Sequence, residues 1–126
     1  MERELIVSEI KSYRDLLIWQ KGIAFVNRVY QETARFPDSE RFGLISQMRR
    51  AAVSIPSNIA EGQARQHTGE FRQFLFISLG SIAEIETQII ISQELGFLTD
   101  EVSKSLQADL LELQKMTRTL ASRLSN

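Results

Sequence analysis

Cysteine is absent from this chain of 126 residues. Disulfide bonds, thiolate metal sites and cysteine nucleophiles are therefore excluded together. Histidine occurs once, at His67, in a polar stretch where we expect an exposed side chain without a catalytic role. Di-iron bundles use Glu-x-x-His motifs on their helices, and the sequence has none; it also lacks a glycine-rich phosphate loop. We therefore predict a protein that is not an enzyme and that holds no metal or cofactor.

The sequence also lacks an excess of charge of either sign, because 15 basic residues face 16 acidic ones and the net charge is −1. No global basic field therefore draws the chain to nucleic acid or to acidic membranes. No uninterrupted apolar run reaches the roughly 18 residues of a membrane span, and no signal-peptide pattern opens the chain. We predict a single soluble domain in the cytoplasm, without a membrane partner.

Proline occurs only twice, and Pro56 falls inside the most regular stretch of the chain, residues 43–65. Apolar residues recur there at steps of three and four, which places them on one helical face: Ile45, Met48, Ala52, Ile55 and Ile59. Because this phase continues across Pro56, we predict one helix with a kink at the proline. We expect Ser54 or Ser57 to bond backbone carbonyls near the kink.

Three further amphipathic stretches predict helices over about residues 13–34, 69–95 and 99–124. Short connections between long helices favour antiparallel neighbours. The predicted fold is all-α, an antiparallel up-down-up-down four-helix bundle. It would span residues 13–126, after an N-terminal arm over residues 1–12.

Residues at the predicted helix ends have the chemistry of caps. Ser12, Thr68 and Thr99 each precede a helix and can accept a hydrogen bond from its first N–H groups. Asp15 stands three residues after Ser12, which is the spacing of a capping box. Gly96 is expected to end the third helix in a left-handed conformation.

The first predicted helix carries two apolar stripes, a wider arc than one bundle seam usually needs. The first stripe contains Leu16, Trp19, Ile23, Val26 and Tyr30. The second stripe lies about 100° away around the helix and contains Ile18, Phe25 and Val29. The alternatives are a deeply buried helix and a contact with another subunit. We predict the contact, and therefore a homo-oligomer interface formed by the second stripe.

The densest basic spot is the doublet Arg49-Arg50, and Arg65 follows on the same predicted helix. These three arginines are the candidate nucleic-acid-binding residues. The alternative is that one arginine of the doublet forms a structural ion pair while the other lies in solvent. Glu86 falls on the apolar side of the third predicted helix. We predict a buried ion pair between Glu86 and Arg49 that joins the second and third helices.

The central stretch resembles a known family. The resemblance rests on Phe36-Pro37, Glu40, Gly43-Leu44, Gln47, Arg49-Arg50-Ala51, the run Ser54-Ile55-Pro56-Ser57-Asn58-Ile59-Ala60-Glu61-Gly62, Phe74-Leu75, Gly80-Ser81, Glu84 and Glu86. This pattern is similar to the signature of four-helix bundle proteins encoded in intervening sequences of bacterial 23S ribosomal RNA genes, and it spans about residues 13–120. The motif positions that it singles out are Arg49, Arg50, Ser54, Pro56, Asn58, Glu61, Glu84 and Glu86.

The resemblance implies a short four-helix bundle, which in some members assembles into a ring-like homopentamer. A related group, the accessory proteins of diversity-generating retroelements, is strongly basic, binds nucleic acid and partners a reverse transcriptase. With the arginine doublet, the resemblance predicts a non-enzymatic homo-oligomeric binding or scaffold protein. Its expected partner is RNA or a nucleoprotein complex, contacted through a basic patch, or a protein of the reverse-transcriptase type. The alternative is a structural or protein-partner assembly module without nucleic-acid binding.

Overall fold

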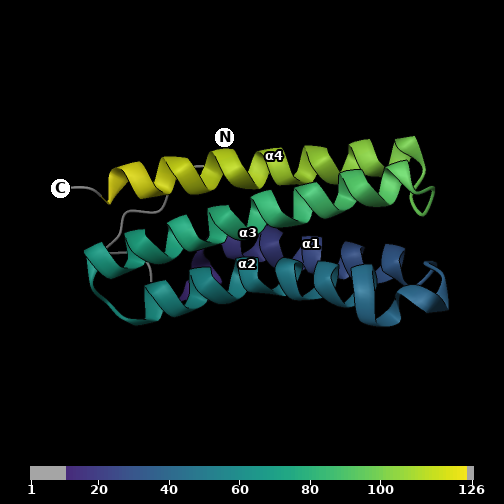
Figure 1. Ribbon diagram of the computed structural model, residues 1–126. Helices are drawn as coiled ribbons and strands as arrows, with labels where there is room; N and C mark the ends of the chain where they lie inside the picture. Colours follow the sequence, from purple (N-terminus) through teal and green to yellow (C-terminus); the bar gives the residue numbers. More distant parts are fainter. Residues whose placement is uncertain (1–10, 125–126) are drawn as a thin grey trace.

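The computed structural model describes residues 11–124, most of which are helical (Figure 1). The long helices are α1 (Leu17–Thr33), α2 (Ser46–Ala64), α3 (Thr68–Glu94) and α4 (Asp100–Arg123). Each runs opposite to its predecessor in Figure 1, and each packs on the next, with α4 also packing on α1. The predicted all-α four-helix bundle is confirmed. The expected arm over residues 1–12 lies almost entirely outside the described residues.

The first helix begins later than predicted. Ser12 and Asp15 form the expected capping box, in which Ser12 Oγ accepts from Arg14 N–H at 2.9 Å and Asp15 Oδ2 accepts from Ser12 N–H at 3.2 Å. The box caps only a 3₁₀ turn, η2 (Tyr13–Asp15), because Leu16 then takes an extended conformation (φ −83°, ψ 126°). α1 follows this break and has no side-chain cap.

An irregular segment also precedes α2. It consists of the 3₁₀ turn η3 (Asp38–Glu40) and the π-helical η4 (Arg41–Ile45). The backbone leaves helical geometry at Gly43 (φ −107°, ψ −113°), and Glu40 Oε1 accepts a hydrogen bond from Leu44 N–H at 3.1 Å across that point. The clear departure from helical geometry in this region is thus at Gly43, thirteen positions before the proline.

α2 passes through Pro56 as one continuous helix, as the periodicity predicted, whereas a kink at the proline stays a prediction. Pro56 is buried against α1. A Cβ added to Gly22 would lie only 3.3 Å from Pro56 Cβ, so the absence of a side chain at Gly22 lets the two helices approach closely. Burial of the ring offsets part of the roughly 3 kcal/mol that an interior helix proline costs.

The two carbonyls immediately before Pro56 receive hydrogen bonds from side chains. Ser78 Oγ on α3 donates to the Ile55 carbonyl at 3.0 Å, and Asn58 Nδ2 donates to the Ser54 carbonyl at 2.8 Å. Ser54 was expected to make such a bond, but its hydroxyl instead pairs with the hydroxyl of Ser81 on α3. The polar side chains around the proline therefore join α2 to α3.

The ends of α3 and α4 confirm two predictions. Gly96 has φ +82° and lies in a Schellman motif, because Phe97 N–H donates to the Ser92 carbonyl at 2.8 Å and Gly96 N–H donates to the Gln93 carbonyl at 3.0 Å. Thr99 caps α4, where its Oγ1 accepts from Val102 N–H at 3.1 Å.

The predicted cap at Thr68 is wrong. His67 occupies the N-cap position of α3 in an extended conformation and makes no side-chain cap bond, so Thr68 is the first helical residue. His67 is exposed, as expected. The preceding Gln66 has φ +62°, in the left-handed region, and lies in the turn between α2 and α3.

The core contains inward-facing side chains from all four helices. Its fully or almost fully buried members include Phe25, Val29, Ile55, Ile59, Leu75, Ile85, Ile89, Leu106, Leu110 and Leu113. The predicted subunit interface at Ile18, Phe25 and Val29 is wrong, because these side chains are 4%, 2% and 0% exposed. α1 packs between α2 and α4, and this packing turns the second stripe toward the bundle axis. The first stripe is the one that reaches the surface, at Ile23 and Tyr30.

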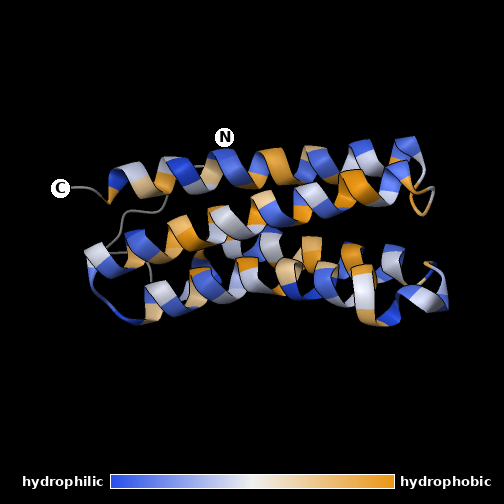
Figure 2. Ribbon diagram, in the orientation of Figure 1, coloured by the Kyte–Doolittle hydropathy of each residue, from blue (hydrophilic) through white to orange (hydrophobic). Residues whose placement is uncertain are grey.

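α3 carries large apolar side chains on its exposed side as well as in the core, and its ribbon alternates orange, white and blue segments (Figure 2). The outer face has five large apolar side chains that are 40–57% exposed, called here the outer strip: Phe76, Ile77, Ile90, Ile91 and Leu95. By length and composition α3 could cross a membrane, but 44% of the relevant window is buried inside the bundle. A core helix of a soluble protein shows the same combination, and the outer strip is what distinguishes α3 from its neighbours.

Candidate functional site

Arg49 lies in the first turn of α2 and is bonded to the C-terminal end of α1. Its Nε donates to Thr33 Oγ1 at 2.9 Å, and its Nη2 donates to the Tyr30 carbonyl at 3.3 Å. Its guanidinium carbon also lies 4.4 Å from the centroid of the Tyr30 ring. Thr33 is buried and donates in turn to the Val29 carbonyl at 2.7 Å. A cation at this position also interacts favourably with the negative end of the α1 dipole.

The predicted ion pair between Arg49 and Glu86 is wrong. Glu86 is exposed, and both acceptors that Arg49 uses are neutral. The α3 side chains that bond to α2 are serines instead: Ser78, Ser81 and Ser92. Their small hydroxyl groups allow close helix contact, which a long Glu–Arg pair in the same seam would prevent.

The ion pairs between helices join α1 to α4. Lys21 Nζ lies 3.3 Å from Glu112 Oε2, and Arg28 Nη1 lies 2.7 Å from Asp109 Oδ2. All four side chains are 33–55% exposed, so each pair contributes at most about 1 kcal/mol. The charges of Lys21 and Arg28 are therefore already balanced by carboxylates on α4.

Arg50 differs from its neighbour in exposure and in bonding. Its side chain is exposed, and it makes no hydrogen bond or ion pair within residues 11–124. Arg49 and Arg50 are adjacent in sequence, so the helix points one side chain toward α1 and leaves the other at the surface. The structural ion pair that the alternative expected is therefore wrong, because Arg49 bonds to neutral acceptors, whereas the expected exposure of the other arginine is found at Arg50.

Both arginines line an open hollow of about 600 Å³ on the outer surface of α1 and α2, called here the α1–α2 hollow. Its lining residues are Tyr30, Ser46, Arg49, Arg50, Val53 and Ser54. The lining thus contains two guanidinium groups, three hydroxyl groups, the aromatic ring of Tyr30 and the apolar side chain of Val53, but no carboxylate. This chemistry suits an anion that carries an apolar or aromatic group.

Arg65, the third candidate, does not join this hollow. It lies fifteen positions after Arg50 on α2, which corresponds to about 22 Å along the helix axis. Its Nη2 is 3.0 Å from Glu61 Oε2, and its guanidinium lies 5.0 Å from the centroid of the Phe74 ring. The charge of Arg65 is therefore balanced one helical turn away, and the three arginines do not form one patch.

The remaining motif residues have structural surroundings or lie at the surface. Ser54, Pro56 and Asn58 belong to the contacts around the proline described above. Glu84 is exposed and lies 3.5 Å from Gln88 Nε2 on the same helix. Among these positions, only Ser54 also lines the α1–α2 hollow.

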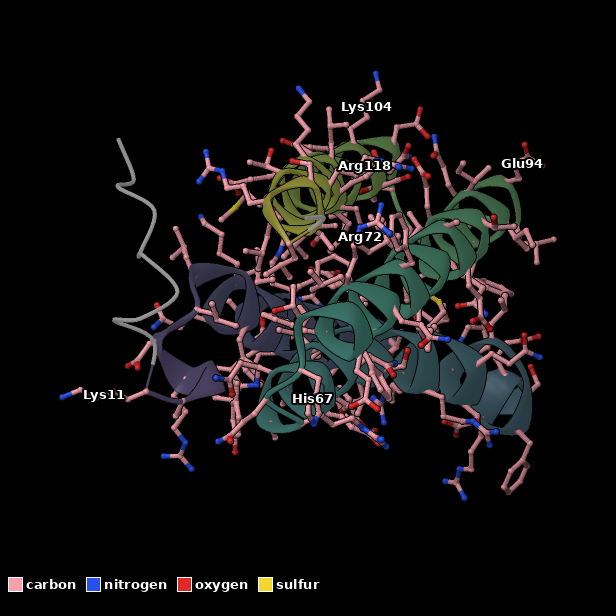
Figure 3. All side chains as sticks on the ribbon, turned by 90° about the vertical axis from the view of Figure 1, so that its left-hand side faces the viewer. Lys11, His67, Arg72, Glu94, Lys104 and Arg118 are labelled. Atoms are coloured by element: carbon pink, nitrogen blue, oxygen red, sulfur yellow. The ribbon has the colours of Figure 1, made fainter. Side chains whose placement is uncertain are left out.

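Not every charged side chain elsewhere points outward, because Arg72 lies between α3 and α4 (Figure 3) and its Nε is buried without a hydrogen-bond partner among the described residues. Figure 3 looks along the bundle from the end with the α2–α3 connection, and Lys11, Glu94 and Lys104 project away from the helices there. Within the described part of the chain, no three His, Asp or Glu side chains are grouped so that they could hold a metal ion. Arg72, which sequence reasoning did not single out, lies on α3 with its guanidinium 4.9 Å from the Phe76 ring centroid, and it does not line the hollow.

Sequence reasoning also missed Tyr30 and Ser46 as parts of the site. Tyr30 was grouped with the apolar stripe of the first helix, but its ring is 42% exposed and lines the hollow. The phenol hydroxyl was the available signal, since it is a polar group on an otherwise apolar stripe.

The geometry defines a small four-helix bundle with a basic hollow and, in residues 11–124, no metal-binding cluster. A family model described as 23S rRNA-intervening sequence protein matches residues 14–119, and the chain belongs to that family. This confirms the resemblance seen in the central motif. The description of the family names no activity.

A solved structure supports the same fold. It is the crystal structure of a protein of unknown function from the S23 ribosomal protein family of Bacteroides thetaiotaomicron VPI-5482, with a TM-score of 0.75 and 23% identity. The match covers 83% of this chain and 98% of that chain. No curated protein matches the sequence. At this identity the comparison establishes the shared fold alone.

Replacing Arg49 with alanine is expected to lower the free energy of unfolding by about 1–2 kcal/mol, because the charge-assisted bonds to the end of α1 are removed. Arg50→Ala is the matched control and should change stability by less than about 0.5 kcal/mol, since Arg50 has no bonded partner in the described part of the chain. Urea unfolding followed by circular dichroism at 222 nm measures both values. Equal midpoints for the two variants would show that Arg49 does not hold α1 and α2 together.

Proposed function

We propose that this protein is a non-enzymatic, homo-oligomeric scaffold that contacts RNA, alone or in a nucleoprotein complex, through the α1–α2 hollow. The observation that carries the proposal is the exposed guanidinium of Arg50 beside Arg49, in a hollow whose lining has no carboxylate. Arginine matches the geometry of phosphate oxygens and binds them with charge-assisted hydrogen bonds. RNA supplies such groups at regular spacing along its backbone.

The net charge of −1 describes the whole chain and does not exclude a locally basic surface. Lys21, Arg28 and Arg65 each lie within 3.3 Å of a carboxylate oxygen. Arg49 has only neutral acceptors, and Arg50 has none among the described residues. Arg49 and Arg50 therefore place two guanidinium groups without an ion-pair partner in residues 11–124 at the hollow, where an exposed charge acts over a Debye length of about 8 Å at physiological salt.

Self-association is supported by the outer strip of α3. Soluble monomers rarely expose large apolar patches, and the strip has five large apolar side chains at 40–57% exposure, in two groups that lie about 20 Å apart along α3. This surface replaces the α1 stripe as the candidate interface. A ring of subunits, five by the family resemblance, would repeat the hollow around its axis and present several arginine pairs to one RNA molecule.

The test is RNA binding as a function of salt. A fluorescein-labelled 20-nucleotide RNA is titrated with the protein between 50 and 200 mM KCl, and anisotropy is recorded. We expect the affinity to fall with salt. Arg50→Ala should weaken binding about tenfold. It should also make the salt dependence shallower by about one unit of slope in a double-logarithmic plot, because one cation that neutralises a phosphate has been removed.

Arg65→Ala is the matched control, because its charge is already paired with Glu61 on the same helix. It should leave both affinity and salt slope nearly unchanged. Absence of binding by the wild-type protein at 50 mM KCl would overturn the proposal.

The second candidate is an assembly module that binds only protein, and the outer strip is the observation that favours it. The RNA titration separates the two candidates. Light scattering at micromolar concentration tests the assembly that they share. A measured mass equal to that of one chain would show that the protein does not self-associate, and would contradict this part of both candidate functions.

A further inference from the structure

The α1–α2 hollow contains an aromatic ring held in a fixed position. Tyr30 is 42% exposed, although α1 buries its neighbours Phe25 and Val29 almost completely. The Arg49 guanidinium lies 4.4 Å from the ring centroid, at cation–π distance. Arg49 is itself held by Thr33 Oγ1 and by the Tyr30 carbonyl. The ring is thus oriented before any ligand arrives, which lowers the entropy cost of stacking on it.

The groups next to the ring complete the contacts of one nucleotide. Val53 is 39% exposed and adds a second apolar surface. Ser46 adds a hydroxyl group that can bond a base edge or a ribose hydroxyl, whereas the Ser54 hydroxyl already pairs with Ser81. Arg50 adds a charge without a described partner. The volume of about 600 Å³ lies within the usual range for small-ligand sites.

We infer that the hollow binds an unpaired nucleotide, with the base stacked on Tyr30 and the adjoining phosphate on Arg50. Within the proposed function, on which this inference rests, the ligand is therefore single-stranded RNA. Bases inside a duplex are covered on both faces by their neighbours and cannot reach a ring on a helix surface. Splayed bases of single strands and loops stack readily on aromatic side chains.

The test compares a 12-nucleotide single-stranded RNA of low self-complementarity with the duplex of the same sequence, both fluorescein-labelled, at 50 mM KCl. The wild-type protein is expected to bind the single strand at least tenfold more tightly than the duplex. Tyr30→Leu removes the π surface and should weaken single-strand binding about tenfold while changing duplex binding little. Tyr30→Phe keeps the ring and should retain the preference for the single strand.

The outcomes distinguish this inference from the proposed function. One outcome would refute the stacking site and leave the phosphate contact in place. In that outcome duplex and single strand bind equally well, Tyr30→Leu has no effect, and Arg50→Ala weakens the binding of both. If neither RNA binds at 50 mM KCl, both proposals are overturned. Should Tyr30→Leu unfold, as circular dichroism would show, the wild-type comparison and the Tyr30→Phe variant still decide the question.

Discussion

Replacing Phe25 with glutamate is expected to unfold the subunit. Phe25 is 2% exposed and lies in the core where α1 packs between α2 and α4. Truncating a buried phenylalanine typically costs about 3–5 kcal/mol, and an unpaired carboxylate in its place adds a desolvation penalty. The sum is comparable with the whole stability of a typical domain, about 5–15 kcal/mol. Circular dichroism at 222 nm should show loss of the helical signal, or a thermal transition shifted below room temperature.

Ile77→Glu is the matched control, because the same change is made on the outer strip at a side chain that is 47% exposed. It should leave the helical signal and the unfolding temperature nearly unchanged. If the strip is the proposed subunit interface, the mass measured by light scattering should fall. A folded Phe25→Glu protein of reduced mass would contradict the core assignment and return the interface to the second stripe of α1.

Replacing Gly62 with alanine is expected to destabilise the bundle by about 2–3 kcal/mol. An added Cβ would lie 2.6 Å from Phe74 Cβ and 3.2 Å from Phe71 Cδ1. Because Phe74 Cβ is attached directly to the α3 backbone, α2 and α3 would have to separate to accept the methyl group. This strain should outweigh the gain of up to about 1 kcal/mol that alanine has over glycine inside a helix.

Gly69→Ala is the control for this effect of close packing. A Cβ at Gly69 meets no atom within 4 Å, so the substitution should be neutral or stabilise the protein by up to about 1 kcal/mol. Urea midpoints of the two variants should therefore move in opposite directions. A shift of the same sign and size at both positions would show that α2 and α3 are not in close contact at Gly62.

Several features of the fold followed from the sequence because they depend on neighbours along the chain. The three- and four-residue recurrence from Ile45 to Ile59 defines a helix whatever surrounds it, and it correctly continued through Pro56. Gly96 and Thr99 end and begin helices through bonds between residues three to five positions apart. The family motif is also partly local, since half of its positions lie between residues 49 and 62.

Other features depended on which helices meet. The two stripes of α1 are both apolar and differ by about 100° around the axis, so periodicity could not decide which one faces the core. Packing against α2 and α4 buried Phe25 and left Tyr30 at the surface. The sequence also identified Arg49 as a residue that bonds across helices, but it suggested the wrong partner.

The partner of Arg49 shows the physical reason for this limit. Thr33 lies sixteen positions earlier, beyond the irregular segment around Gly43, and no local pattern fixes the path of that segment. Only the folded chain brings the end of α1 beside the first turn of α2. That juxtaposition gives the Arg49 guanidinium its hydrogen-bond acceptor on α1 and leaves Arg50 exposed. It also places the ring of Tyr30 in the same hollow. The residue types of the hollow were therefore present in the sequence, whereas their grouping was decided by the tertiary structure.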